Sequence, residues 1–437
     1  MSEHFPEQPT APMQSLFDEL ESATSATAQA TVQPASTAHT SERALLDVWT
    51  ARLLSGVVVP YCRGLAARRL HRACWWVDGL TSSSKTGKSV SAGAFVEAAT
   101  ALAGAGFALR GLHLEPPRVR PKRGASGEVA AATETRGKPE APALPTLASI
   151  TPGALPEQLG NAPAMLLLDP LAAPLTTEDL LPLCQRQAPT ELLLLISAAK
   201  LERLANDVPA GTPVVQEALA SDAPAGTAAL QGALTALLRS DAWKGIWARP
   251  DNRAEKVRRT LELLRALLKP AFLHVCLAPL GEQPIPAPRH YLLFASRQDA
   301  SVALVSDYLC AEQARVLAER EARALQGTWF ARRREKARAA AWAALKEELY
   351  TLGRERRARL WPELKPLLVL AHFGEFSSAD YDTALDELMR EGRVFCRWSP
   401  ANAPADEAGA AARRVPGQQD FLEFLQPQTR PVWRRGG

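Results

Sequence analysis

The stretch that decides the fold reads Cys74-Trp75-Trp76-Val77-Asp78-Gly79-Leu80-Thr81-Ser82-Ser83-Ser84-Lys85-Thr86-Gly87-Lys88-Ser89. Its first four residues are apolar or aromatic and predict a buried strand that ends near Asp78-Gly79. A loop of small polar residues follows, and the run from Ala92 to Ala105 then has the composition of a helix. A strand, a small-residue loop and a helix in this order build phosphate or nucleoside sites in open α/β sheets.

The loop allows two interpretations. Gly87-Lys88-Ser89 ends a near-match to a phosphate-binding loop in which Ser82 replaces the first glycine, so that Lys88 would contact the phosphates of ATP and Ser89 would hold Mg²⁺. Alternatively, Asp78-Gly79 ends the first strand of a Rossmann-like methyltransferase, where small residues let the chain approach S-adenosylmethionine. The loop alone leaves both interpretations open.

Composition restricts the class of protein. The chain has 437 residues, a formal net charge of +4 and six scattered cysteines. No apolar run approaches the roughly 20 residues that span a bilayer, and the first residues do not resemble a signal peptide. The cysteines do not have the spacing of metal ligands or of a disulfide framework. We therefore expect a soluble, cytoplasmic protein with reduced thiols, no membrane contact and no metal site.

Changes in composition along the chain predict its domain organisation. Residues 1–42 are polar and acidic and predict a disordered tail. Residues 43–317 predict a Rossmann methyltransferase-like domain of α/β class, interrupted by a Pro-rich and basic flexible insertion at 116–149. Residues 318–425 predict a basic helix followed by a winged-helix-like domain, and 426–437 predict a second tail.

Two further predicted strands are followed by acidic residues. The strand from Phe107 to Leu114 is followed by Glu115, which is placed to accept hydrogen bonds from a ribose. The continuously apolar run 164–168 ends at Asp169-Pro170 and is typical of a strand buried on both faces of a parallel sheet. A further strand is expected at 191–196. An adjacent strand pair at 272–277 and 290–296 would close the sheet as in a seven-stranded methyltransferase, whose last strand is antiparallel.

The C-terminal third has a different pattern. The run from Trp329 to Trp361 predicts one long helix or a broken pair, with a basic cluster that includes Arg332, Arg333, Arg334 and Lys336. A short helix from Pro366 to Phe373, a helix that begins near Ser377 and a strand at 393–398 complete the order of a winged helix. The second of these helices carries acids that would repel phosphates (Asp380, Asp382, Asp386, Glu387 and Glu391). The basic cluster remains a candidate nucleic-acid contact, while the winged helix fits protein docking or a structural role better than sequence reading.

Several motifs, taken together, resemble those of the three-Cys-motif partner (TcmP) family, a bacterial methyltransferase-like family. Trp76-Val77-Asp78-Gly79-Leu80 follows the family's first motif, although Thr81-Ser82-Ser83-Ser84 replaces its glycine-rich loop. Leu168-Asp169-Pro170 resembles its aspartate-proline strand end, and Arg203 falls where a family arginine follows the next strand. The sequence also contains Ser240-Asp241-Ala242-Trp243 and His290-Tyr291-Leu292-Leu293-Phe294-Ala295-Ser296-Arg297, which resemble two later motifs.

The resemblance implies a methyltransferase-like fold and association with a separate three-Cys-motif protein of radical S-adenosylmethionine type. It implies cofactor contacts at the strand ends and in the loop, namely at Asp78, Gly79, Ser82, Ser84, Gly87 and Glu115. Asp169 would lie near the transferred methyl group, and Arg203 and Arg297 would steady an acidic substrate. Because Ser82 and Ser84 obstruct a close backbone approach, the cofactor site could be degenerate. A non-catalytic scaffold that binds protein or DNA, and an NTPase that uses Lys88, Ser89 and Asp169, are the alternatives.

Overall fold

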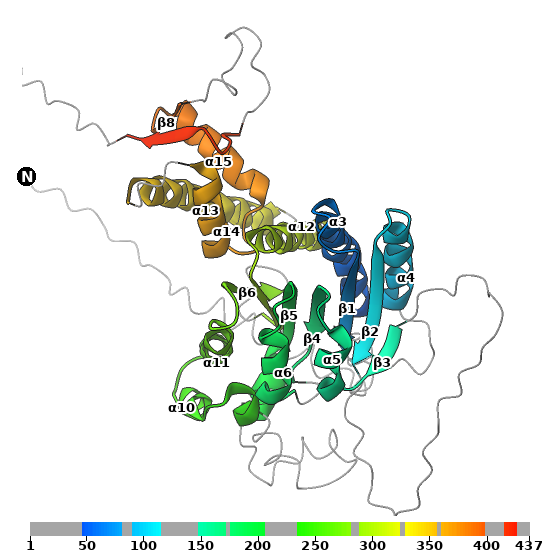
Figure 1. Cartoon of the computed structure of the whole chain (residues 1–437). Coiled ribbons are helices and arrows are strands. Elements are labelled where there is room, and N and C mark those ends of the chain that lie inside the picture. Colours follow the sequence, from blue (N-terminus) through cyan, green and yellow to red (C-terminus); the bar gives the residue numbers. More distant parts are fainter. Residues whose placement is uncertain are drawn as a thin grey trace, which may run out of the picture.

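The computed structural model describes residues 46–80, 90–114, 147–171, 175–205, 234–280, 288–323, 328–355, 360–397 and 415–425. These residues form a seven-stranded sheet covered by helices on both faces, together with a C-terminal group of helices and a two-stranded sheet (Figure 1). Among the described residues, no helix is both long and apolar enough to cross a membrane.

The large sheet is mostly parallel. Its strands are Ala73–Gly79 (β1), Ala108–Leu114 (β2), Leu147–Ile150 (β3), Ala164–Leu168 (β4), Thr190–Ser197 (β5), His274–Leu280 (β6) and His290–Ser296 (β7). They are ordered β3-β2-β1-β4-β5-β7-β6. β1 to β5 pair in parallel, whereas β7 lies antiparallel between β5 and β6. The apolar runs at β4 and β5 are buried along their whole length, as a strand covered on both faces requires.

Alternate side chains of these strands enter two separate cores. On one face, Trp76 and Leu167 pack with the helix at residues 46–53, which continues as the π-helix Leu54–Val58 (η1). This core also includes the helices Val59–Ala67 (α3), Val90–Ala103 (α4) and Asp299–Arg323 (α12). On the other face, Val77 and Leu166 pack with helices Leu155–Leu159 (α5), Thr177–Cys184 (α6), Ala198–Ala205 (α7), Ala242–Trp247 (α10) and Arg253–Leu268 (α11). A short 3-10 helix, Pro152–Ala154 (η2), precedes α5.

The end of the predicted insertion at 116–149 is ordered structure. Residues 147–150 form β3, which pairs in parallel with β2 at the edge of the sheet. The prediction failed there because β3 has only four residues, which are too few to show the alternating apolar pattern of a strand next to the prolines. The remainder of the insertion, the tails at 1–42 and 426–437, and Glu115 lie outside the described residues.

The C-terminal third contains the expected helices with shifted boundaries, and a second strand that was not predicted. Its helices are Thr328–Glu355 (α13), Trp361–Ala371 (α14) and Ser378–Arg390 (α15), and the strands Val394–Arg397 (β8) and Phe421–Phe424 (β9) pair antiparallel. The prediction that a short helix begins at Pro366 was wrong, since Pro366 lies inside α14. The helix begins at Trp361 with Pro362 in its first turn, where the missing amide hydrogen costs no bond.

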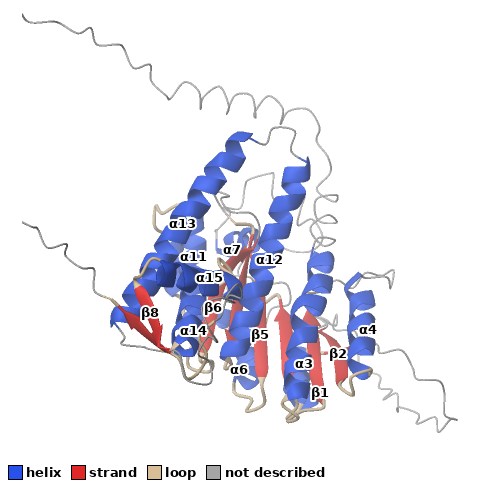
Figure 2. Ribbon diagram, turned by 90° about the horizontal axis from the view of Figure 1, so that it is seen from above, coloured by secondary structure: helices blue, strands red, loops and turns tan. Residues whose placement is uncertain are grey.

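The C-terminal helices share the core of the sheet. The boundary predicted at residue 317 falls inside α12, which continues to Arg323. The rings of Phe294 on β7 and Phe373 after α14 stack with centroids 6.0 Å apart. The backbone amide of Ser378 also donates to Asp307 Oδ1 of α12 at 2.6 Å. One hydrophobic core therefore extends from the sheet through α12 to α15 (Figure 2).

Candidate functional site

Asp78 and Asp169 lie at the carboxyl ends of adjacent parallel strands. Asp78 pairs in register with Leu167 of β4, and Gly79 pairs with Leu168, the residue that precedes Asp169. The strand order reverses between β1 and β4, because β2 and β3 lie on one side of β1 while β4 and β5 lie on the other. Open α/β sheets bind ligands in the crevice at this point. The two acids therefore lie at the same edge of the sheet.

Asp78 is buried, with 5% of its surface exposed. Its Oδ1 accepts a hydrogen bond from the backbone amide of Leu80 at 3.0 Å. Burial raises the pKa of Asp78 from 3.8 to about 6, and the negative charge of Asp47 raises it further. The Leu80 amide and His113 act in the opposite direction, because they favour the charged form. His113 pairs with Asp78 on the neighbouring strand β2. A positive group or a hydrogen-bond donor that reaches Asp78 therefore stabilises its charged form.

Gly79 lies in a tightly packed position, whatever its role toward a ligand. A Cβ atom at this position would lie 2.8 Å from Leu168 Cδ2 and 3.2 Å from the carbonyl oxygen of Leu167. A side chain at residue 79 would therefore require Leu168 and the β4 backbone to shift.

The carboxylate of Asp169 is held by two donors. Lys200 Nζ donates to Oδ2 at 2.6 Å, and the backbone amide of Leu171 donates to Oδ1 at 2.9 Å. Lys200 lies in the first turn of α7, directly after β5, so that β5 delivers it to the same edge of the sheet. Arg203, which was predicted to steady an acidic substrate, lies three residues further along α7 with an exposed side chain. The base beside Asp169 is therefore Lys200, which the sequence reasoning missed because nothing in the spacing separates the two.

Asp47 occupies the N-terminus of α4, the helix that follows the small-residue loop. Its Oδ2 accepts from the Val90 amide at 2.7 Å, and its Oδ1 accepts from the Ser91 amide at 3.0 Å. A helix N-terminus attracts anions, because its first amides lack partners within the helix and the dipole is positive there. Here the chain supplies that anion itself. The contact joins two segments 43 residues apart, which explains why the sequence pattern did not reveal it.

Arg297 lies at the opposite edge of the sheet. β7 is antiparallel, so its end is next to the beginning of β5 and β6. The Arg297 guanidinium donates to the carbonyls of Ala271 at 2.9 Å and Arg186 at 2.8 Å, and to that of Cys184. Arg297, which was predicted to steady an acidic substrate, does not lie at the edge that holds Asp78 and Asp169, because the antiparallel direction of β7 carries it to the other edge.

A second buried acid lies near Arg297, at the edge far from Asp78. Glu191 on β5 is fully buried, and its Oε1 accepts from Ser301 Oγ of α12 at 2.9 Å. Burial raises the pKa of Glu191 from 4.5 to about 7, while the hydroxyl groups of Ser296 and Ser301 favour its ionised form. Glu191 is thus half ionised near neutral pH in a fully buried position.

Compared with the wild type, the Glu191→Gln variant is expected to become more stable as pH rises. The native pKa lies above the unfolded value, so the wild type loses stability between about pH 4.5 and pH 7, by on the order of 2 kcal/mol. Glutamine keeps the oxygen that accepts from Ser301 and has no charge to bury. Urea unfolding at pH 5 and pH 8 measures the difference, with Glu97→Gln on the exposed face of α4 as control. An equal effect of Glu191→Gln at both pH values would contradict the buried-charge explanation.

The remaining predicted site residues divide into two groups. Those in the loop and at the end of β2 lie outside the described residues: Ser82, Ser84, Gly87, Lys88, Ser89 and Glu115. Those of the basic cluster lie on α13, where Arg332 and Lys336 are exposed; Arg333 and Arg334 belong to the same helix, but their side chains are not described. In the described part of the chain, no group of three or more His, Cys, Asp or Glu side chains could hold a metal ion.

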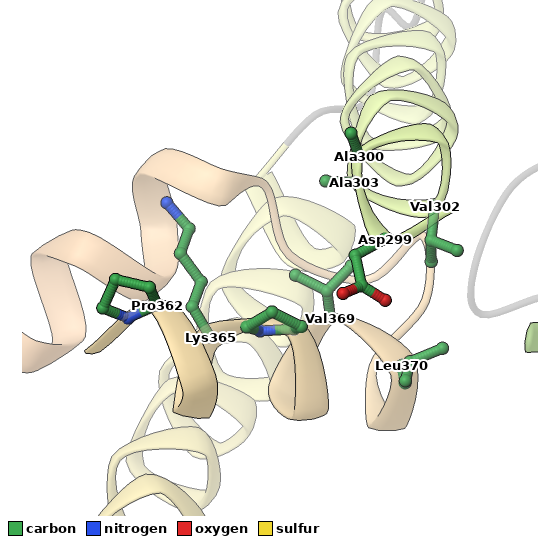
Figure 3. Close-up of a pocket in the computed structure, with 9 residues that line it drawn as sticks. Asp299, Ala300, Val302, Ala303, Pro362, Lys365, Val369 and Leu370 are labelled. Carbon is green, nitrogen blue, oxygen red and sulfur yellow. The ribbon is translucent and has the colours of Figure 1, made fainter. Parts of the chain in front are cut away.

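Two pockets occur away from the switch point. The first, of about 200 Å³, lies between the start of α12 and α14 and is almost wholly apolar, with Asp299 and Lys365 among its lining residues (Figure 3). The second, of about 480 Å³, lies between α11 and the strands β6 and β7. Lys365 binds Asp382 of α15 at 2.8 Å, and His274 pairs with Asp299 at 2.5 Å, so the charges that line the first pocket serve the packing of the fold.

No protein-family model matches the chain, and no significant match is found among curated proteins or solved structures. The functional inference therefore depends on the geometry described above and on the motif resemblance.

Proposed function

We propose that the chain binds S-adenosylmethionine at the switch point between β1 and β4 and acts as a methyltransferase-like partner of a three-Cys-motif protein. The observation that carries the proposal is the pair of acids, Asp78 and Asp169, at the carboxyl ends of the two strands between which the order reverses. The antiparallel β7 between β5 and β6 gives further support, since the resemblance implies a sheet whose last strand has this direction.

The charges around the site favour a cationic ligand over a polyphosphate. Asp47 already holds the amides of Val90 and Ser91, which follow directly on Lys88-Ser89 of the phosphate-loop near-match. A triphosphate bound there would have to displace Asp47 or lie beside its negative charge. S-adenosylmethionine has a sulfonium and an amino group, both positive, which Asp78 and Asp47 would attract. We therefore rank the ATP and Mg²⁺ alternative below the S-adenosylmethionine site.

Each acid has its own part in this proposal. Asp78 binds a donor group of the ligand, and a positive ligand group lowers its raised pKa, so that it is fully ionised in the complex. S-adenosylmethionine supplies an electrophilic methyl group on sulfur. Asp169, oriented by Lys200 and the Leu171 amide, lies at the end of the neighbouring strand, where it can orient a methyl acceptor. Arg203, exposed on α7, is placed to meet an acidic substrate arriving from solvent.

The second candidate is a scaffold of the same fold that has lost its cofactor. The serines at 82 and 84 support it, because side chains there hinder the close backbone approach that glycine allows. The tight packing at Gly79 is compatible with it, since contact with Leu168 favours a glycine there without any ligand.

Isothermal titration calorimetry of the full chain separates these functions. We expect heat on addition of S-adenosylmethionine, no heat with ATP and Mg²⁺, and unchanged S-adenosylmethionine affinity in Lys88→Ala. Heat with ATP that Lys88→Ala abolishes would instead establish the NTPase. No heat from either ligand would leave the scaffold as the function.

Association with a three-Cys-motif protein rests on the resemblance alone and needs its own experiment. Co-expression of the full chain with such a protein, followed by affinity purification through a tag on one of the two, is expected to recover both. Recovery of one protein alone would remove the partner from the proposal and leave the ligand site to be judged by calorimetry.

A further inference from the structure

The first half of α13 extends beyond the packed C-terminal helices. Residues 335–341 and the alanines at 343 and 344 are exposed, and packing begins at Trp342 and Leu345. Trp342 donates to Glu387 of α15 at 3.0 Å, and Leu345 is fully buried. Figure 2 shows this half of α13 projecting from the body of the protein. We call residues 328–341 the basic arm.

The basic arm has a high positive charge that the neighbouring helices α14 and α15 do not share. Its five bases are Arg332, Arg333, Arg334, Lys336 and Arg338, against the single acid Glu335. Arg332, Lys336 and Arg338 are all exposed. A projecting helix with several exposed bases attracts a polyanion, and the positive end of its dipole adds to that attraction.

The bases are distributed around the helix rather than along one face. At about 100° per residue, Lys336 lies about 40° from Arg332, whereas Arg338 lies about 120° away on the other side. A flat acidic surface would neutralise bases on one side only. The major groove of B-form DNA is about 12 Å wide, admits a helix about 10–12 Å across and has phosphates along both walls.

We infer that the basic arm binds double-stranded DNA by lying in the major groove and contacting the phosphates on both sides. This inference is independent of the proposed ligand site, which lies at the sheet edge. The arm fits this partner better than α15 does, because α15 is packed between neighbouring elements. The acids of α15 also make hydrogen bonds within the C-terminal helices: Asp382 accepts from Trp361, Glu387 accepts from Lys346, and Asp380 caps the start of α15. The proposed DNA contact is therefore the arm and not the acidic helix α15.

The test is DNA binding by the full chain as a function of salt. Fluorescence anisotropy with a 30-base-pair duplex between 50 and 200 mM salt compares the wild type with the triple variant Arg332→Gln, Lys336→Gln, Arg338→Gln. Glutamine keeps the helix propensity. Loss of three phosphate contacts is expected to reduce the slope of log affinity against log salt by about 3 and to weaken binding at 100 mM salt about tenfold or more.

The matched control removes three exposed bases of the sheet domain, Arg63→Gln, Arg239→Gln and Arg249→Gln, and is expected to leave the slope nearly unchanged. Equal effects of both triple variants would show that net charge alone binds DNA and would overturn the inference. Absence of duplex DNA binding by the wild type would also overturn the inference. Equal affinity for polyglutamate, single-stranded DNA or an RNA duplex would overturn it as well, because the deep, narrow major groove of RNA does not admit a helix.

Discussion

Asp78→Asn is expected to make the protein more stable at pH 8 while it weakens S-adenosylmethionine binding roughly 10- to 100-fold, the equivalent of one hydrogen bond to a charged group. Asparagine keeps the oxygen that accepts from Leu80 and removes a charge whose burial is unfavourable. Because the native pKa of about 6 exceeds the ordinary value of 3.8, the wild type loses stability as pH rises through this range. The advantage of the variant therefore grows from pH 4 to pH 7, to on the order of 2 kcal/mol.

Urea unfolding at several pH values and calorimetry with S-adenosylmethionine measure the two effects in the same preparation. A gain in stability with unchanged affinity would mean that Asp78 is a buried acid without a ligand role. A loss of stability at pH 8 would contradict the account of its burial. Glu97→Gln, an exposed acid on α4, is the control and should change neither quantity.

Arg297→Ala is expected to lower the free energy of unfolding by about 2–5 kcal/mol. The variant leaves the carbonyls of Ala271, Arg186 and Cys184 without their guanidinium donor, and it removes a cation 5.1 Å from the centre of the Phe272 ring. Lysine cannot reproduce a planar group with three separate donors, so Arg297→Lys should recover only part of the loss. Urea unfolding at neutral pH provides the measurement.

Arg289→Ala serves as the control, since Arg289 is exposed next to the start of β7 and its loss should cost less than about 0.5 kcal/mol. Calorimetry with S-adenosylmethionine should give the same affinity in folded Arg297→Ala as in the wild type. A variant with wild-type stability and weakened ligand or substrate binding would restore the role first predicted for Arg297.

The strand ends were predictable because burial on both faces makes their sequences continuous apolar runs. The runs before Asp78 and Asp169 each appeared as a buried strand followed by an acid, and the structure has both strands and the acids at one edge. The same criterion missed β3, a four-residue edge strand. Arg297 was misplaced for another reason: the antiparallel direction expected for the closing strand was not applied to the residue that follows it.

The partners of the acids were not predictable from the sequence. Lys200 and Arg203 are both bases after β5, and only the start of α7 decides which of them reaches Asp169. Nothing in the sequence distinguishes Asp47 from the other acids of the N-terminal region. It meets α4 because the helix at residues 46–53 packs on the same face of the sheet.

The sequence by itself determined the α/β class, the buried strands and the acids that follow them, since hydrophobic burial and strand ends act locally along the chain. Only the tertiary structure decided which charges are paired. It placed Lys200 on Asp169, Asp47 on the first amides of α4 and Arg297 at the far edge. These contacts depend on strand order and direction, which result from packing between distant segments and leave no periodic pattern in any one of them.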